Sequence, residues 1–255
     1  MKGLEKGKKI GLALGGGAAL GAVHIGVLKA LEELDIEVAY ITGTSIGALI
    51  ASLHAFGKTS NEIEDVVTDL KWLDVSGLSL SRYGLLSNDK LGDLINDCIG
   101  SVRFEDSNIP LAMIATNITT GEKVIIEKND VAAGVMASTC IPGVFIPIEI
   151  EDQLLVDGGI VENVPISPLR KMGADLIIGI DLNGQHTHKR PENIIEVLLN
   201  SFDFTMLTSA KMQNREADIL IQPNLSSFNR VDIDQAPQLI DVGYKTALDV
   251  LKEEV

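Results

Sequence analysis

The segment Val38–Ala51, VAYITGTSIGALIA, constrains the fold of this chain more than any other. It joins an apolar, strand-like run to a run of small apolar residues typical of a buried helix, through the turn Gly43–Gly47. A strand, a Gly-x-Ser-x-Gly turn and a helix in this order are the context that makes a serine a nucleophile. The turn is so tight that glycine is expected on both sides of Ser45. Ser45 is therefore the candidate nucleophile, at a helix N-terminus aimed at any oxyanion that forms there.

A strand, a glycine loop and a helix also precede this turn. The buried run 9–14 ends at three consecutive glycines, and residues 18–34 have the apolar spacing of a helix. Backbone N–H groups at such a helix start point toward negative charge. A phosphate-binding P-loop would need Gly-Lys-Ser/Thr, which is absent, and a dinucleotide fingerprint fails at Leu20. Two interpretations remain, a tight turn without chemistry and an oxyanion hole formed by amides near Gly16 and Gly17.

The two glycine-containing turns are expected to lie together. A right-handed crossover between the strands at 9–14 and 38–41 would make them parallel neighbours in one sheet. Their following loops would then meet at the carboxyl edge of that sheet, where open α/β sheets bind ligands.

The remaining sequence alternates between strand and helix patterns. This alternation predicts an α/β protein, a three-layer α/β/α sandwich with a mainly parallel central sheet. We expect one domain over residues 1–255, with core motifs in 9–182 and the C-terminal helices and last strand in 191–255. Residues 75–86 are either an ordinary loop or a lid or channel wall. The other predicted helices are 59–72, 87–99, 129–139, 165–172, 191–212 and 236–254, and the other strands are 110–116, 123–126, 144–150, 153–156, 175–180 and 218–221.

Charge and cysteine content restrict the partners and the compartment. The formal net charge is −15, which argues against nucleic acid and against tight docking on anionic lipid. Cys98 and Cys140 are too few for a disulfide framework, suit a reducing cytosol and are expected to be structural. Lysines before an apolar run resemble a signal peptide, but glycines interrupt that run. We expect a cytoplasmic protein with no signal peptide or membrane span, for which transient contact with a membrane surface is an open alternative.

A serine nucleophile needs a base, and the residues leave two choices open. Asp157 ends a predicted strand and is followed by Gly158 and Gly159, so large side chains do not block it. Asp157 could take the proton from Ser45 directly if burial raises its pKa. Alternatively, a histidine could complete a Ser…Asp…His triad. The four histidines are His24 and His54, which we expect to be packed or at the surface, and His186 and His188, which follow Asp157 in the order that a triad requires.

Four segments together resemble the patatin-like phospholipases, in particular their small bacterial members. They are Leu14–Leu28 with its glycine loop, Gly43–Gly47, Ala137–Phe145 (ASTCIPGVF), and Asp157–Pro165, which begins Asp-Gly-Gly and ends Asn-Val-Pro. The resemblance implies that Ser45 is the nucleophile, that Asp157 is the general base and that Gly15–Ala18 form the oxyanion hole. It implies neither metal nor cofactor. The elbow and motif glycines are Gly43, Gly47, Gly158 and Gly159.

The resemblance implies a serine esterase that cleaves carboxylic esters of phospholipids or related lipids through an acyl-enzyme. Many family members carry Arg or Lys where this chain has Leu20, so a charge that could meet a phosphate headgroup is absent there. This difference favours a general lipid or ester acyl hydrolase. The alternatives are a triad esterase acting on small esters, a nucleotide- or phosphate-binding protein without hydrolase activity, and a catalytically silent interaction module.

Overall fold

The computed structural model describes residues 4, 7–68, 77–78, 84–184, 190–191 and 194–254. Their main sheet has the strand order β11-β10-β1-β2-β5-β9-β8, with β6 paired to β5. Five neighbouring strands are parallel: β11 (Ile219–Ile221), β10 (Leu176–Ile180), β1 (Ile10–Leu14), β2 (Val38–Thr44) and β5 (Leu111–Asn117). Three are antiparallel to their neighbours: β6 (Lys123–Ile126), β8 (Ile148–Ile150) and β9 (Gln153–Asp157).

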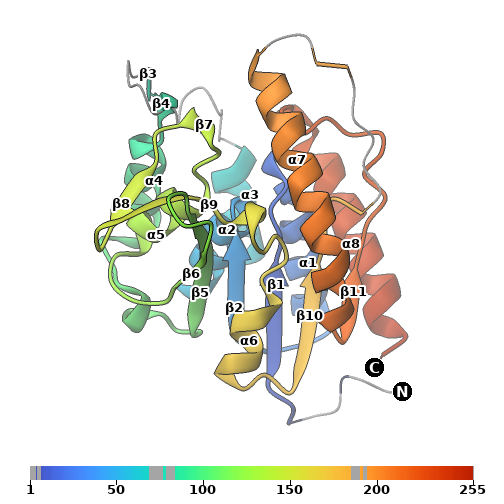
Figure 1. The fold of residues 1–255 in the computed structure, drawn as a ribbon. Helices are drawn as coiled ribbons and strands as arrows, with labels where there is room; N and C mark the ends of the chain where they lie inside the picture. Colours follow the sequence, from blue (N-terminus) through green and yellow to red (C-terminus); the bar gives the residue numbers. More distant parts are fainter. Residues whose placement is uncertain are drawn as a thin grey trace.

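Helices lie on both faces of this sheet (Figure 1). Successive residues of β1 alternate between the two faces, so that Leu12 and Leu14 enter the large core cluster while Ala13 packs with residues of α6. The large cluster also contains residues of α1 (Ala22–Glu33), α2 (Ile46–Ala55), α3 (Ser60–Thr68), α4 (Asp89–Ile99), α5 (Val131–Ser138) and α8 (Ala236–Lys252). The predicted α/β fold with a mainly parallel sheet and flanking helices is thus confirmed.

Helices α6 (Ile166–Met172) and α7 (Ile194–Gln213) lie in front of the sheet in Figure 1. A smaller sheet, in the order β3-β4-β7, lies beside the upper part of α7 and contains β3 (Gly77–Leu78), β4 (Gly84–Ser87) and β7 (Gly143–Phe145). The single extended run predicted over 144–150 is divided between the two sheets, because β7 pairs with β4 whereas β8 pairs with β9. Most of 75–86, and the predicted end of the helix at 69–72, lie outside the described residues.

The strand register brings the predicted motifs to one edge of the main sheet. Leu14 of β1 pairs with Gly43 of β2, so the glycine loop and the serine turn leave the sheet at the same level. Thr44 pairs with Ile114 of β5, and the next β5 residue pairs with Asp157 of β9. Adjacent strands lie about 4.8 Å apart, so Ser45 and Asp157 flank one residue of β5 from its two sides.

Candidate active site

Ser45 is held in a strained turn between β2 and α2. Its φ of 55° lies in the left-handed region, which an L-residue other than glycine adopts at a cost. The two flanking glycines are needed because the backbone passes close by: a Cβ on Gly47 would lie 2.1 Å from the Leu14 carbonyl oxygen, and one on Gly43 would lie 2.4 Å from the Ala48 Cα. The side chain of Ser45 is thereby placed at the edge of a cavity, with only 8% of the residue exposed.

A second serine ties this turn to β5. The Ser45 amide donates to Ser138 Oγ at 3.0 Å, and the Ser138 hydroxyl donates to the Ile114 carbonyl at 2.7 Å. Ser138 thus connects α5, the serine turn and the strand that separates Ser45 from Asp157. Its segment was part of the family resemblance, but only the folded chain reveals this bridging contact.

Asp157 is completely buried at the end of β9. Its Oδ1 accepts a hydrogen bond from the Gly159 amide at 2.8 Å, and its carbonyl accepts one from the Thr116 hydroxyl at 2.9 Å. Its other carboxylate oxygen, Oδ2, is also buried. Among the described residues, no donor meets both the distance and the angle of a hydrogen bond to it. The Ser45 hydroxyl is nevertheless near enough to hold down the pKa of Asp157 through a side-chain hydrogen bond.

Burial dominates the acidity of this carboxyl group. The pKa of Asp157 is raised to about 7. Loss of solvent is the largest cause, hydrogen bonds from the Ser45 hydroxyl and the Gly159 amide act in the opposite direction, and the nearby Asp203 carboxylate adds to the rise. An aspartate with a pKa near neutrality can accept a proton and later return it in the same pH range.

The amides of the glycine loop fall into two groups, those that donate to backbone carbonyls and those that do not. The Gly15 amide donates to the Ile180 carbonyl at 3.2 Å, and the Gly16 amide donates to the Asn163 carbonyl at 3.3 Å. Within the part of the chain that the structure describes, the amides of Gly17 and Ala18 have no such acceptor. Both of these residues line the cavity beside Ser45. Of the four residues expected to form an oxyanion hole, these two have amides left for a ligand.

The carbonyl of Gly16 is clamped from two sides. The Asn183 side-chain amide donates to it at 3.0 Å, and that of Asn163 donates at 3.4 Å. In a trans peptide the C=O of one residue and the N–H of the next point in opposite directions. Fixing the Gly16 carbonyl therefore fixes the direction of the Gly17 N–H.

A buried ion pair supports this clamp from the C-terminal part of the chain. The Arg230 guanidinium donates to the Asn183 side-chain oxygen and pairs with Asp203 of α7 at 2.9 Å. The carbonyl of Arg230 also accepts a hydrogen bond from the Ala19 amide at 2.9 Å. The glycine loop is thus connected through Arg230 to the helix that forms one wall of the cavity.

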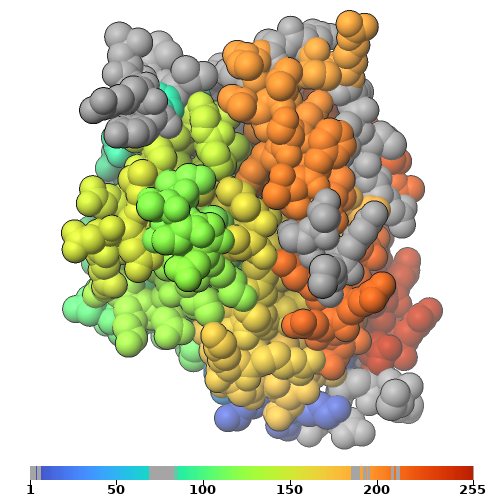
Figure 2. Space-filling view, in the orientation of Figure 1, coloured from blue at the N-terminus to red at the C-terminus, as the bar shows by residue number. Residues whose placement is uncertain are grey.

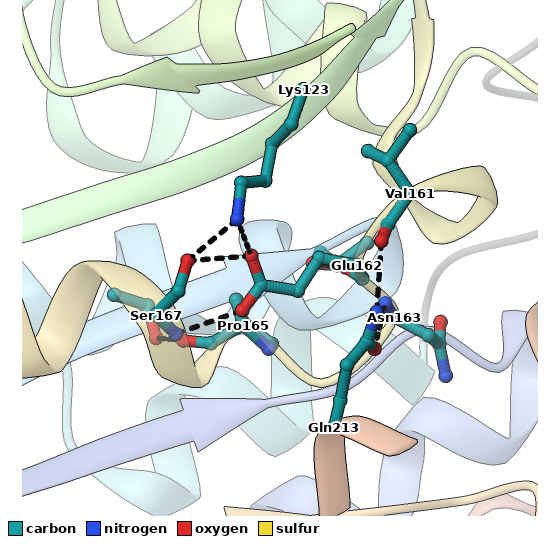
Figure 3. A network of polar contacts seen from close by, with 9 residues as sticks. Lys123, Val161, Glu162, Asn163, Pro165, Ser167 and Gln213 are labelled. Carbon is teal, nitrogen blue, oxygen red and sulfur yellow. Dashed lines mark hydrogen bonds and ion pairs between the residues drawn. The ribbon is translucent and has the colours of Figure 1, made fainter. Parts of the chain in front are cut away.

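The segment after Asp157-Gly-Gly is pinned to the sheet by a polar network (Figure 3). Glu162 is buried, pairs with Lys123 of β6 at 2.7 Å and accepts hydrogen bonds from the amide and hydroxyl of Ser167. Gln213 of α7 donates to the Val161 carbonyl and accepts from the Asn163 amide, closing the other side. This network fixes the position of the asparagine that clamps the glycine loop.

The cavity beside Ser45 has a volume of about 300 Å³ and mainly apolar walls. Arg230 is the one basic side chain among its described lining residues, and it is paired with Asp203. One wall of the cavity is formed by residues of β4 and β7 in the small sheet, and another by residues of α7. The lining residues are Gly17, Ala18, Ser45, Leu86, Ile141, Val144, Phe145, Leu199, Phe202, Asp203, Met206, Arg230 and Val231.

The histidines that the structure describes lie away from the Ser45–Asp157 pair. His24 is buried and its Nε2 hydrogen-bonds the Gly15 carbonyl at 2.7 Å, while burial lowers its pKa to about 4. It is therefore neutral and supports the glycine loop from behind. Burial also lowers the pKa of His54, which lies at the far end of α2. His186 and His188 lie outside the described residues.

Two further sequence expectations concern a cysteine and a leucine. Cys140 is buried, and burial together with the charge of Asp157 raises the pKa of its thiol to about 12, which makes it a poor nucleophile. Leu20 is completely buried in the large core cluster.

Across the described residues, no group of three or more His, Cys, Asp or Glu side chains could hold a metal ion. No helix in the same set is both long and apolar enough to cross a bilayer.

Comparison with known proteins places the chain in a family. The model of the patatin-like phospholipase family matches residues 12–170, which is more than half of the chain. The chain therefore belongs to the patatin-like phospholipase family, as its motifs predicted.

Its relatives include proteins of bacteria and animals. An uncharacterized NTE family protein of Mycobacterium tuberculosis is 36% identical over 69% of this chain and 49% of its own length. Neuropathy target esterase of Drosophila melanogaster is 34% identical over 70% of this chain and 13% of its own length. This chain thus spans about half the length of the mycobacterial relative. Among solved structures, VipD of Legionella pneumophila shares the fold with a TM-score of 0.58 and 14% identity, over 99% of this chain and 68% of VipD.

The buried carboxyl group generates a prediction about stability. The pKa of Asp157 is about 7 in the fold, against 3.8 for a free side chain, so between these values the folded chain holds a proton that the unfolded chain has lost. Its contribution to the free energy of unfolding is therefore fully present below pH 3.8 and falls as pH rises toward 7. Asp157→Asn should raise the free energy of unfolding at pH 8 by about 2 kcal/mol or more and have little effect at pH 4.

Urea unfolding of both proteins at the two pH values would measure this difference. The exposed Asp152→Asn is a matched control and should change stability by less than about 0.5 kcal/mol at either pH. An Asp157→Asn protein that is less stable than the wild type at pH 8 would contradict the account of the buried carboxyl group.

Proposed function

We propose that this chain is a serine esterase that hydrolyses carboxylic esters of phospholipids or related lipids by a Ser45–Asp157 dyad. One observation carries the proposal: Ser45 and the buried Asp157 flank the same position of β5, at the sheet edge where the glycine loop also ends. Membership of the patatin-like phospholipase family supports it, as does the name lysophospholipase carried by the relative from Coccidioides immitis, which is 27% identical over 97% of this chain.

The proposed reaction proceeds in two halves. In the first, Ser45 Oγ attacks the acyl carbonyl carbon while Asp157 accepts the hydroxyl proton. The N–H groups of Gly17 and Ala18 stabilise the oxyanion of the tetrahedral intermediate. When the intermediate collapses, the alcohol leaves with the proton from Asp157, and the acyl group stays on Ser45. In the second half, Asp157 takes a proton from water, the resulting hydroxide attacks the acyl-enzyme, and Ser45 recovers its proton as the fatty acid leaves.

The cavity supports a lipid-like substrate. Its walls are apolar on the sides formed by the small sheet and by α7, which suits an acyl chain placed with its ester next to Ser45. We infer that α7 and the segment around Arg230 form one domain with the family core, since they complete the same cavity. The free thiols of Cys98 and Cys140 are consistent with a cytoplasmic location.

Removal of either member of the dyad tests the proposal. Ser45→Ala and Asp157→Asn should each lower kcat for p-nitrophenyl butyrate by at least about 10³-fold, because nucleophile and base act as one unit. Circular dichroism would show that both variants are folded. Full activity in either variant would refute that residue's role. An equal loss in His186→Ala or His188→Ala, with both dyad variants inactive, would replace the dyad with a triad.

The buried base also determines the pH dependence. Since Asp157 must be ionised to accept a proton, kcat/KM should rise with pH through a midpoint near 7 and then level off. Asp203→Asn should move this midpoint to lower pH, because the Asp203 carboxylate raises the pKa of Asp157. Rate measurements from pH 5 to 9 on both proteins would decide. A flat wild-type profile between pH 6 and 8 would exclude Asp157 as the titrating base.

The hydrogen bond from Asn183 to the glycine loop can be tested by a substitution that replaces its side-chain nitrogen with an oxygen. Asn183→Asp keeps an acceptor for Arg230 but removes the donor to the Gly16 carbonyl. We expect kcat to fall about tenfold with KM within twofold, because the oxyanion forms only during the reaction. The matched control is Asn88→Asp, a buried asparagine that donates to the Met136 carbonyl away from the loop. An equal loss of kcat in the two variants would show that the effect is not specific to the loop.

A further inference from the structure

The cavity beside Ser45 has two apolar walls that come from elements in direct contact. One wall belongs to β4 and β7, and the other to α7. Leu198 of α7 packs against the cluster that contains Val144 and Phe145, and a Cβ on Gly143 would lie 3.3 Å from the Leu198 Cδ1. Figure 2 shows residues of β7 (yellow-green) beside those of α7 (orange) at the surface. The distance between the two walls is therefore set by packing within the chain.

The volume between these walls limits the size of the group that can enter. An apolar cavity of about 150 Å³ holds one benzene molecule, which has six carbon atoms. By that measure a cavity of about 300 Å³ holds about twelve non-hydrogen atoms. Two of these are the ester oxygens next to Ser45, which leaves space for an acyl chain of about ten carbons. A chain of about sixteen carbons, or a second chain, exceeds this space.

The α7 wall is a row of three apolar side chains. Leu199, Phe202 and Met206 follow one another at spacings of three and four residues, so they share one face of the helix. Met206 lies beside the Asp157-Gly-Gly turn, since a Cβ on Gly159 would lie 2.6 Å from the Met206 Sδ. A helix rises about 1.5 Å per residue, so Phe202 lies about 6 Å and Leu199 about 10 Å farther along the axis. The Phe202 ring thus lies in the middle of this wall.

We propose that the cavity accepts a single acyl chain of about eight to twelve carbons and that Phe202 sets this limit. The inference rests on the proposed function and deepens it, since it names the acyl group that Ser45 receives. Helix α7 begins at Ile194, beyond the family match that ends at residue 170, so the limit belongs to the C-terminal segment of this chain. Each methylene group that enters an apolar cavity favours binding by up to about fourfold, whereas one that stays in water adds nothing.

The experiment measures kcat/KM for p-nitrophenyl esters with acyl chains of four to sixteen carbons, all presented in the same detergent micelles. Phe202→Ala removes a six-carbon ring from the α7 wall, and Leu199→Phe makes the same wall bulkier. Phe56→Ala is the matched control, because it removes the same ring from another partly buried phenylalanine, at the far end of α2. The readout is the ratio of kcat/KM for the sixteen-carbon ester to that for the eight-carbon ester, which does not depend on the fraction of folded protein.

We expect the wild type to be most active on esters of about eight to twelve carbons. Phe202→Ala should raise the ratio by at least about tenfold, because the freed space admits methylene groups that the wild type leaves in water. Leu199→Phe should lower activity on the twelve-carbon ester more than on the eight-carbon ester. Phe56→Ala should keep the wild-type ratio within about twofold, because it does not line the cavity.

Binding measured without catalysis separates this inference from the esterase proposal. Fatty acids of six to sixteen carbons are titrated calorimetrically into Ser45→Ala, and their Kd should fall up to about ten carbons and then level off. This pattern, together with no hydrolysis of any ester by the wild type, would refute the esterase proposal alone. The chain-length limit would be overturned by a Kd or a wild-type kcat/KM that keeps improving to sixteen carbons, or by the absence of fatty acid binding. An unchanged ratio in Phe202→Ala, or an equal change in Phe56→Ala, would overturn it as well.

Discussion

Burial of the Asp157 carboxyl group is the constraint on which the rest of the site depends. Away from water this group favours its protonated form, and only a few neighbours partly compensate its charge. The sheet creates this burial, because β9 lies between β5 and β8 and delivers the carboxyl group under the loop that follows it. Gly158 is required there, since a Cβ would lie 2.2 Å from the Ile114 carbonyl oxygen. The fold thus gives up stability to place a carboxyl group of near-neutral pKa beside a serine.

Sequence reasoning found the fold and the motif residues because both depend on local patterns. The Gly43–Gly47 turn and the glycine loop have fixed spacings, and a parallel sheet brings such turns to one edge. Sequence reasoning could not find Ser138, Asn183 or Arg230, because their roles arise from contacts between distant segments. Arg230 meets Asn183 across 47 positions, and Asn183 meets Gly16 across 167. No local spacing encodes such pairs.

The glycine loop shows the same limit at the level of single atoms. Sequence reasoning treats the amides of Gly15, Gly16, Gly17 and Ala18 as equivalent donors, since all four precede a helix. Strand β10 and the Asn163 segment accept hydrogen bonds from the first two. Which amides are left for a ligand depends on where those acceptors lie in three dimensions, so it is a property of the assembled sheet edge.

The residues of the site come from two parts of the chain, the segment that matches the family and the segment C-terminal to it. The family match ends at residue 170, and it contains Ser45, Asp157 and the glycine loop. The wall formed by α7, the Asp203–Arg230 pair and Val231 lies beyond it. In our proposal the chemistry thus resides in the matched segment, whereas the C-terminal segment shapes the cavity and its approach. Because Arg230 also supports Asn183, a change in this segment would reach the glycine loop as well as the cavity wall. In the proposed enzyme, a change at the buried Asp203–Arg230 pair would therefore affect both the cavity wall and the support of the glycine loop.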